Sequence, residues 1–154
     1  MDNARSHGPT CPEVIAIDPD HCHAEHVGRT GDGRQFFAST PFVPAIDGAG
    51  NEFVALYLFD REGRLLEAVI DEPGPRATDN AARQRELLEQ RVRELGPVVR
   101  CRIEIRPFSV RRFGIEFGLV SRRASGDDDS WWVELLPGNY MAFHEPFDSG
   151  EYDT

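Results

Sequence analysis

One stretch of the sequence, residues 52–71, constrains the fold more than any other. Phe53 to Phe59 is apolar or aromatic at every position, which is too short for a membrane span and too continuous for a strand with one wet face. This pattern predicts a central strand covered on both sides. Asp60 to Gly63 supplies an aspartate that starts a turn and a glycine that accepts positive φ, so we expect Leu65 to Ile70 to pair back as a hairpin.

Length and composition predict one soluble domain. A chain of 154 residues can bury one sizeable core, and 40% hydrophobic with 10% aromatic residues is typical of a globular protein. No run approaches the roughly 18 apolar residues of a membrane helix, and the N-terminus lacks the apolar core of a secretory signal. We expect a cytoplasmic protein without membrane association, with a mobile arm at residues 1–12, one α+β domain at 13–147 and an acidic tail at 148–154.

Charge and cysteine content narrow the function classes. The net charge of −10 disfavours nucleic-acid binding, because a phosphate backbone would be repelled by most of the surface. The three cysteines, Cys11, Cys22 and Cys101, form an odd set without the dense spacing of a disulfide scaffold. This favours a reducing compartment, with a Cys11–Cys22 bridge as the alternative.

A single helix is predicted at residues 79–95. Its apolar residues recur at helical spacing, and Gly96 and Pro97 follow where a helix should end. The segment 72–75 contains two prolines and a glycine and should break the chain before it. We expect the helix to pack on one sheet face; a partner-binding helix is the alternative.

The remaining elements are predicted strands. Residues 26–30 and 34–40 flank the turn signal Gly31-Asp32-Gly33 and predict a second hairpin. Other strands are predicted near residues 13–17, 99–105, 113–119, 131–136 and 140–143. The fold class is therefore α+β: a single antiparallel or mixed sheet of about eight strands built from hairpins, with helix 79–95 on one face.

A cluster of imidazoles and thiols near the N-terminus carries the chemistry of a transition-metal site. Nitrogen and sulfur ligands suit zinc or a related metal, although the spacing matches no zinc motif. A solvated polar loop is the alternative reading, and a metal-binding enzyme or sensor is the function that a true site would imply. The residues are His21, His23, His26, Cys11 and Cys22.

An arginine-rich strand face forms a second candidate site. Arg100, Arg102 and Arg106 alternate with apolar residues and could grip a carboxylate or phosphate through bidentate contacts, as in a regulator that binds a small anion. Cross-strand ion pairing with nearby acids is the alternative.

The C-terminal segment combines carboxylates with large aromatic side chains, a composition suited to binding a basic protein. The alternative is a tail folded back on the arginine face. No catalytic motif is present, so the leading prediction is a small non-catalytic binding protein of unknown specific role. The predicted contact residues are Trp131, Trp132, Tyr140, Phe143, Asp148, Glu151 and Tyr152.

Overall fold

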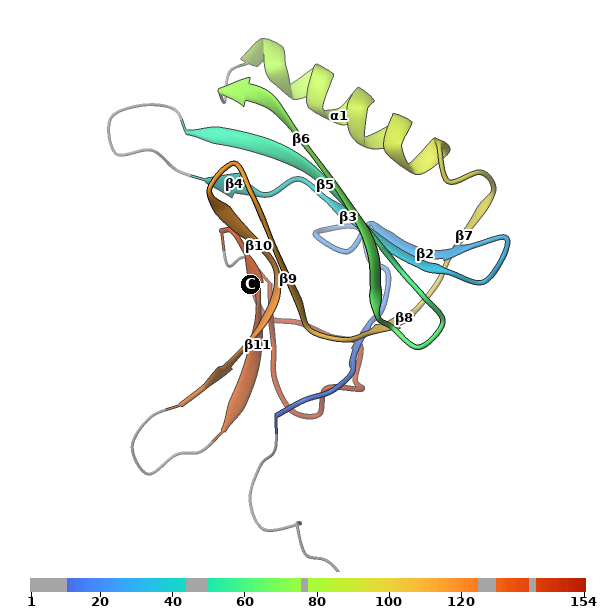
Figure 1. Ribbon diagram of the computed structural model, residues 1–154, viewed down its shortest axis with the longest axis vertical. Helices are drawn as coiled ribbons and strands as arrows, with labels where there is room; N and C mark the ends of the chain where they lie inside the picture. Colours follow the sequence, from blue (N-terminus) through green and yellow to red (C-terminus); the bar gives the residue numbers. More distant parts are fainter. Residues whose placement is uncertain (1–10, 44–49, 76–77, 125–129, 139–140) are drawn as a thin grey trace, which may run out of the picture.

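The predicted central hairpin forms the middle of the structure. The computed structural model describes residues 11–43, 50–75, 78–124, 130–138 and 141–154 (Figure 1). Strand β5 (Asn51–Phe59) pairs with β6 (Leu65–Pro75) through the turn that the sequence predicts. In that turn the amide of Gly63 donates to the carbonyl of Asp60, and the Asp60 carboxylate accepts the amides of Glu62 and Arg64.

The larger sheet grows outward from β5 on both sides. Strand β6 lies along one side of β5, and β3 and β4 lie one after the other along its other side. Asn51 of β5, for example, pairs with Pro75 of β6 and with Val43 of β4. Strand β2 pairs with the other side of β3, and β7 pairs with β2. All of these pairs are antiparallel. The remaining strands of this six-stranded sheet are β2 (His26–Thr30), β3 (Gln35–Ser39), β4 (Phe42–Val43) and β7 (Val98–Arg100).

A second antiparallel sheet covers one face of the first (Figure 1). Phe53, Tyr57 and Phe59 point into the space between the two sheets, where the ring of Phe117 lies 5.3 Å from that of Phe53. The members of the smaller sheet, in spatial order, are β12 (Ala142–Phe143), β11 (Trp131–Leu136), β10 (Ile115–Arg123) and β9 (Phe108–Arg112). Strands β1 (Ile15–Ile17) and β8 (Ile103–Ile105) form a separate antiparallel pair.

Helix α1 (Thr78–Arg93) covers the opposite face of the larger sheet. Val54, Leu56 and Leu58 alternate with the residues that face the second sheet and belong instead to a separate apolar cluster that includes Leu88 of the helix. This confirms that the continuous apolar run is a strand buried on both faces. No helix in the described part of the chain has the length and apolar character needed to cross a bilayer.

The prediction of one sheet of about eight strands is wrong, although α+β holds coarsely. The strand predicted at 99–105 is divided: β7 pairs with β2, and β8 pairs with β1. Between them, Cys101 and Arg102 carry the chain from one sheet to another. Alternation of apolar and charged residues shows that a strand has one buried face, but it does not show which sheet that face belongs to.

Two local predictions also differ from the structure. Phe113, predicted inside a strand, has φ 55° and precedes Gly114 at φ 73°, so the two residues form the turn of the β9–β10 hairpin. Strand β6 continues to Pro75 through the segment predicted to break the chain. Among the described strands β6 pairs with β5 alone, and an edge strand tolerates proline because one side of it needs no donors.

Truncations in the two core layers should have unequal effects. Phe117 is fully buried between the sheets, so Phe117→Ala should lower the free energy of unfolding by about 3–5 kcal/mol. Leu88 is 8% exposed on a helix whose Leu87 and Val92 are half-buried, so Leu88→Ala should cost about 2 kcal/mol. Urea unfolding of both variants measures the difference, and an equal or larger effect of Leu88→Ala would contradict this account of the layers.

Candidate functional site

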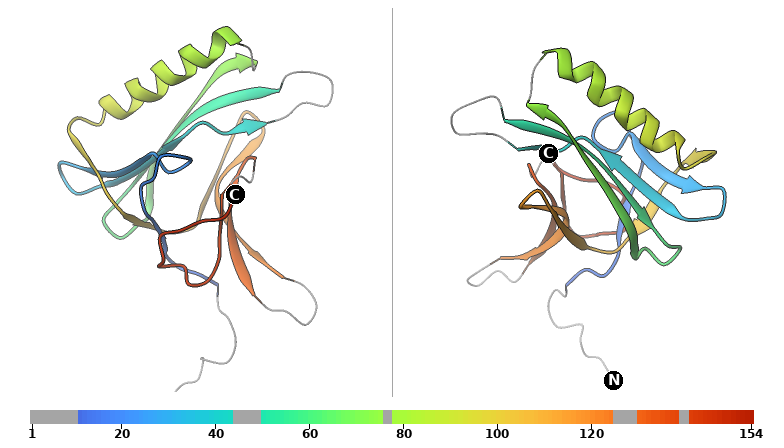
Figure 2. Two further views of the ribbon diagram at one scale, coloured as in Figure 1. Left: turned by 180° about the vertical axis from the view of Figure 1, so that it is seen from behind. Right: turned by 45° about the horizontal axis from the view of Figure 1, so that its top comes forward.

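The C-terminal segment, residues 144–154, is held against the body of the protein by backbone hydrogen bonds. The amide of Ala16 donates to the carbonyl of Phe147 at 2.9 Å, and the amide of Asp18 donates to that of Gly150 at 3.0 Å. Ala142 and Asp153 then exchange two hydrogen bonds in an isolated bridge. Figure 2 shows these last residues, in red, running back beside the blue N-terminal strand.

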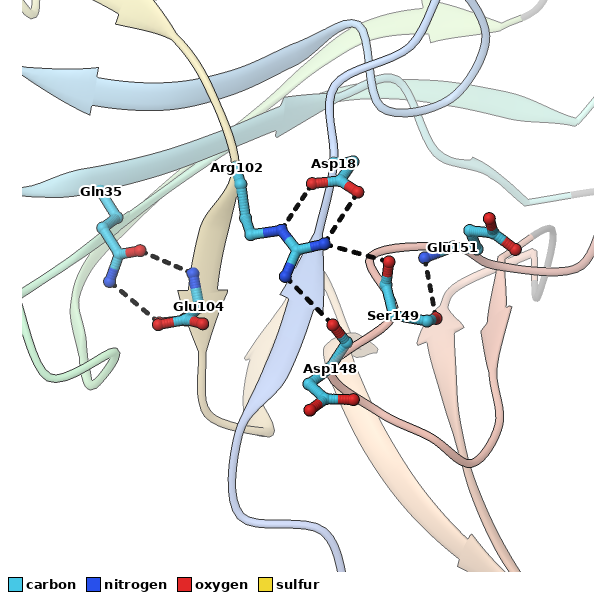
Figure 3. Close-up of polar contacts among 7 residues, drawn as sticks. All are labelled: Asp18, Gln35, Arg102, Glu104, Asp148, Ser149 and Glu151. Atoms are coloured by element: carbon cyan, nitrogen blue, oxygen red, sulfur yellow. Dashed lines mark hydrogen bonds and ion pairs between the residues drawn. The ribbon is translucent and has the colours of Figure 1, made fainter.

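Arg102 connects this segment to the end of β1 (Figure 3). Its Nε and one terminal nitrogen donate to the two oxygens of Asp18 at 2.6 and 3.0 Å, and its terminal nitrogens donate to the carbonyls of Asp148 and Ser149 at 3.0 and 3.1 Å. The hydrogen bonds from Arg102 lower the pKa of Asp18. Gly150 has φ 86°, and a Cβ there would lie 2.1 Å from Asp18 Oδ2, so glycine leaves room for the ion pair.

Tyr152 makes a second connection. Its hydroxyl donates to Oδ2 of Asp20 at 2.5 Å and accepts the backbone amide of His23 at 3.1 Å. Burial, together with the hydrogen bond to Asp20, raises the pKa of Tyr152 to about 12. For Asp20 the burial penalty is outweighed by the hydrogen bonds from Tyr152 and from the amides of Cys22 and Ala24, and its pKa is lowered.

The outward side of the segment presents carboxylates, and we call it the acidic face. It consists of the exposed side chains of Glu145, Asp148, Glu151 and Asp153. Two depressions flank Tyr152 and Glu151: one of about 510 Å³ reaches Asp18 and Asp20, and one of about 210 Å³ reaches His144 and Glu145. His144 Nδ1 lies 3.0 Å from Asp153 Oδ2, and residues 124–154 contain no lysine or arginine.

The structure gathers some of the predicted contact residues and separates others. Asp148, Glu151 and Tyr152 lie together on the C-terminal segment. Phe143 is 1% exposed and belongs to the core, so its assignment to a contact surface is corrected. Tyr140 lies outside the described residues.

The two predicted tryptophans are half-buried on β11. The Trp132 indole N–H donates to Glu134 at 2.9 Å, and the Arg123 guanidinium lies 5.7 Å from the centre of the Trp131 ring. Neither tryptophan lines the depressions formed by the described residues of the acidic face.

The predicted anion-binding arginines each donate to acceptors of the protein itself. Arg100 donates to the carbonyls of Glu25 and Asp20, and Arg106 to that of Glu62. Arg102 donates in the same way to the carbonyls of Asp148 and Ser149. The arrangement is closest to the alternative of a tail folded back on the arginine face.

The N-terminal His/Cys cluster is divided. Cys22, His23 and His26 line one pocket of about 270 Å³, whereas His21 and Cys11 do not line it. Across the described residues, no three His, Cys, Asp or Glu side chains come together as a metal-binding group. All three cysteines are free, so the alternative Cys11–Cys22 bridge is not formed.

Comparison with known proteins does not assign the chain to a family. Neither a family model, nor a curated protein, nor a solved structure matches the chain. The geometry of its own surface is therefore what points to a function.

Removing the Tyr152 hydroxyl should loosen the C-terminal segment. Tyr152→Phe keeps the ring but loses the hydrogen bonds to Asp20 and His23, so we expect the free energy of unfolding to fall by about 1–2 kcal/mol and the pKa of Asp20 to rise. Urea unfolding and an NMR titration of Asp20 measure both effects. Glu151→Gln, at an exposed site, is the control and should change neither quantity.

The same residue predicts an alkaline transition. Because the pKa of Tyr152 is raised from 10.0 to about 12, its contribution to stability is complete below pH 10 and is lost as the pH rises towards 12. The stability difference between the wild type and Tyr152→Phe should therefore shrink over this range. A difference that stays constant from pH 9 to pH 12 would mean that Tyr152 ionises as an unperturbed phenol.

Proposed function

We propose that this protein is a small non-catalytic binding protein whose acidic face captures a basic protein partner. The observation that carries the proposal is the docking of residues 144–154. Their backbone is tied to β1 and β12, while their carboxylates remain exposed. The cell compartment is proposed to be the cytoplasm, in agreement with three free cysteines.

Preorganisation favours this use of the segment. A disordered acidic tail loses backbone freedom when it binds, which reduces its affinity. Here the hydrogen bonds from Ala16 and Asp18 and the bridge between Ala142 and Asp153 hold the backbone before any partner arrives. The charges of the acidic face are therefore presented in one arrangement, which supports specific recognition.

Electrostatics determine the class of partner. The net charge of −10 and the absence of basic residues in the segment 124–154 give a field that repels acidic proteins and nucleic acids. A basic protein would be attracted, and complementary charge raises the association rate above that of neutral surfaces. The alternative of a regulator that binds a small anion gains no support, because the guanidiniums nearest this face already donate to Asp18 and to carbonyls.

Apolar surface is also present at the acidic face. Tyr152 and Phe147 are half-buried, and Tyr152 lines both depressions. Interfaces take most of their binding energy from a few aromatic or arginine anchors surrounded by polar residues. A lysine or arginine side chain of the partner would fit the depression between Asp20 and Glu151, with its aliphatic part against Tyr152.

Charge reversal tests the proposal. The variant Asp148→Lys/Glu151→Lys changes two exposed side chains of the acidic face, and the control Glu67→Lys/Glu86→Lys changes two exposed side chains on β6 and α1. Both variants move the net charge from −10 to −6. Cell proteins retained on each immobilised form would be identified, and each candidate partner would be purified for calorimetry.

A basic protein that binds the wild type and the control, and binds the acidic-face variant at least tenfold more weakly, is the expected result. Its affinity should also fall as salt is added. If both variants bind equally well, or if the retained protein is acidic, the acidic face is not the binding surface.

A further inference from the structure

Strand β6 forms one edge of the larger sheet, and its outward side has no neighbouring strand. Figure 1 shows β6 in green, with α1 lying above it. Among the described strands it pairs with β5 alone. The prolines at 73 and 75 lack an amide, so the part of the edge with a full set of backbone donors is residues 65–72. An unpaired strand edge presents N–H and C=O groups to which another extended chain can bond.

The hydrogen-bond pattern of the sheet determines which backbone groups of β6 point outward. Opposite residues of antiparallel strands alternate between hydrogen-bonded and non-hydrogen-bonded pairs. The amide of Thr30 donates to the carbonyl of Arg34, so residues 35, 37 and 39 of β3 bond to β5 rather than to β2. Residues 55, 57 and 59 of β5 therefore bond to β3, and residues 54, 56 and 58 bond to β6. Ala68 and Ile70, opposite residues 57 and 55, direct their amides and carbonyls away from β5.

The backbone groups of Ala68 and Ile70 are available to a ligand. None of the hydrogen bonds between described residues involves the amide or the carbonyl of either residue. On the side that faces the second sheet, both side chains belong to the half-buried margin of the core, together with Phe108 and Val110 of β9. An added strand would therefore find free backbone partners and an apolar margin on this side.

The helix side of the same edge is hollow and acidic. A depression of about 420 Å³ lies between β6 and α1, and its described charged residues are three acids and one base: Asp71, Glu72, Glu86 and Arg83. Arg91 already pairs with Asp71, whereas Glu72 and Glu86 are exposed. Strand β6 itself carries three acids and no base. A basic side chain is the complement of this side, and Leu87 in the lining would contact its aliphatic part.

We propose that the β6 edge binds, by strand addition, an extended segment of another protein in which apolar and basic residues alternate. Such a segment presents its apolar side chains to one side and its basic side chains to the other. The backbone would pair with Ala68 and Ile70, the apolar side chains would extend the core margin beside β9, and the basic side chains would enter the depression beside α1. In strand addition, main-chain hydrogen bonds provide affinity, and alternate side chains provide specificity.

Charge and position distinguish this ligand from two others. A second copy of the chain is disfavoured, because pairing of β6 with itself would bring together the three acids of each strand. The basic partner proposed for the acidic face binds elsewhere: β9 and β12 are opposite edges of the smaller sheet, β6 lies near β9, and the C-terminal segment is bonded to β12. The strand-addition site does not rest on that proposed function.

A pair of synthetic peptides tests the charge requirement. Isotope-labelled wild-type protein would be titrated with a capped seven-residue peptide of alternating lysine and valine, and with its counterpart of alternating glutamate and valine. The lysine peptide should shift the amide resonances of Ala68 and Ile70 in a saturable way. It should also slow the hydrogen exchange of these two amides, which in the free protein should be faster than that of Val69, because Val69 bonds to β5. The glutamate peptide should produce neither effect.

Backbone methylation of the peptide tests the geometry. Residues directly opposite in an antiparallel pair have their side chains on the same face. The valines should therefore lie opposite Ala68 and Ile70, and their amides should donate to β6. Methylating two valine amides of the lysine peptide should abolish binding, whereas methylating two lysine amides should leave it unchanged. This comparison leaves the protein unaltered and so does not depend on how a variant folds.

Two protein variants locate the site. Ala68→Pro removes an amide that does not bond to β5, so the melting temperature should stay close to that of the wild type while peptide binding is lost. Glu67→Lys/Glu86→Lys, the control for the acidic face, here changes two acids beside the β6 edge and should weaken peptide binding about tenfold. Asp148→Lys/Glu151→Lys, with the same change in net charge, should bind the peptide as the wild type does. The two surfaces thus predict opposite patterns.

Several outcomes would overturn the proposal. Equal binding of the lysine and glutamate peptides would show that charge does not select the ligand, and equal effects of the two methylations would exclude strand addition. Shifts confined to residues 144–154 would place the peptide on the acidic face. Exchange at Ala68 and Ile70 that slows with rising protein concentration, without peptide, would show that a second copy occupies the edge. Absence of binding to the folded wild type would remove the site.

Discussion

Burial of β5 on both faces is the constraint on which the rest of the fold depends. Its alternate residues face a second sheet on one side and a helix on the other, and each face must be covered because about 25 cal/mol of stabilisation per Å² of apolar surface is lost otherwise. The helix alone can cover only one face. The small sheet formed by β9 to β12 is therefore as necessary as the helix, although its strands are individually less apolar.

The crossing of the chain between β7 and β8 links this fold to its surface. Strand β7 pairs with β2, and the next strand, β8, pairs with β1 in a register that sets Ile103 opposite Ile17. The next residues along each strand are Arg102 and Asp18, so their ion pair is a consequence of that register. Arg102 then reaches the carbonyls of residues 148 and 149, and the last part of the chain closes over β1.

The features that could be predicted from sequence are local ones. The hairpins around Asp60 and Asp32 were predictable because an aspartate and a glycine lie between two strand patterns, and both turns form. The turn at Phe113 was not predictable from local pattern. Its positive φ occurs beside Gly114, and its ring packs near that of Phe53, a residue far away in sequence. Likewise, the division of one alternating pattern between two sheets depends on β1, which the pattern itself does not contain.

The candidate surface was predictable in composition but not in arrangement. Acidic residues with Tyr152 near the C-terminus indicated a surface for a basic partner, which remains a proposal. The two contacts that hold them in place join residues 84 and 132 positions apart, and no spacing rule connects Arg102 with Asp18 or Tyr152 with Asp20. Phe143 was misplaced because an aromatic residue has the same sequence signature in a core as at an interface.

The loop of residues 18–26 contributes both to the acidic face and to the pocket of about 270 Å³. On one side Asp20 and the amide of His23 hold Tyr152, and on the other the side chains of His23 and His26 line the pocket. The Asp20 carboxylate accepts bonds from Tyr152 and from two amides of the loop itself, so the loop conformation and the docking of the C-terminal segment are stabilised together. A segment that left β1 would deprive Asp20 of one partner, and the wall of the pocket would lose part of its support.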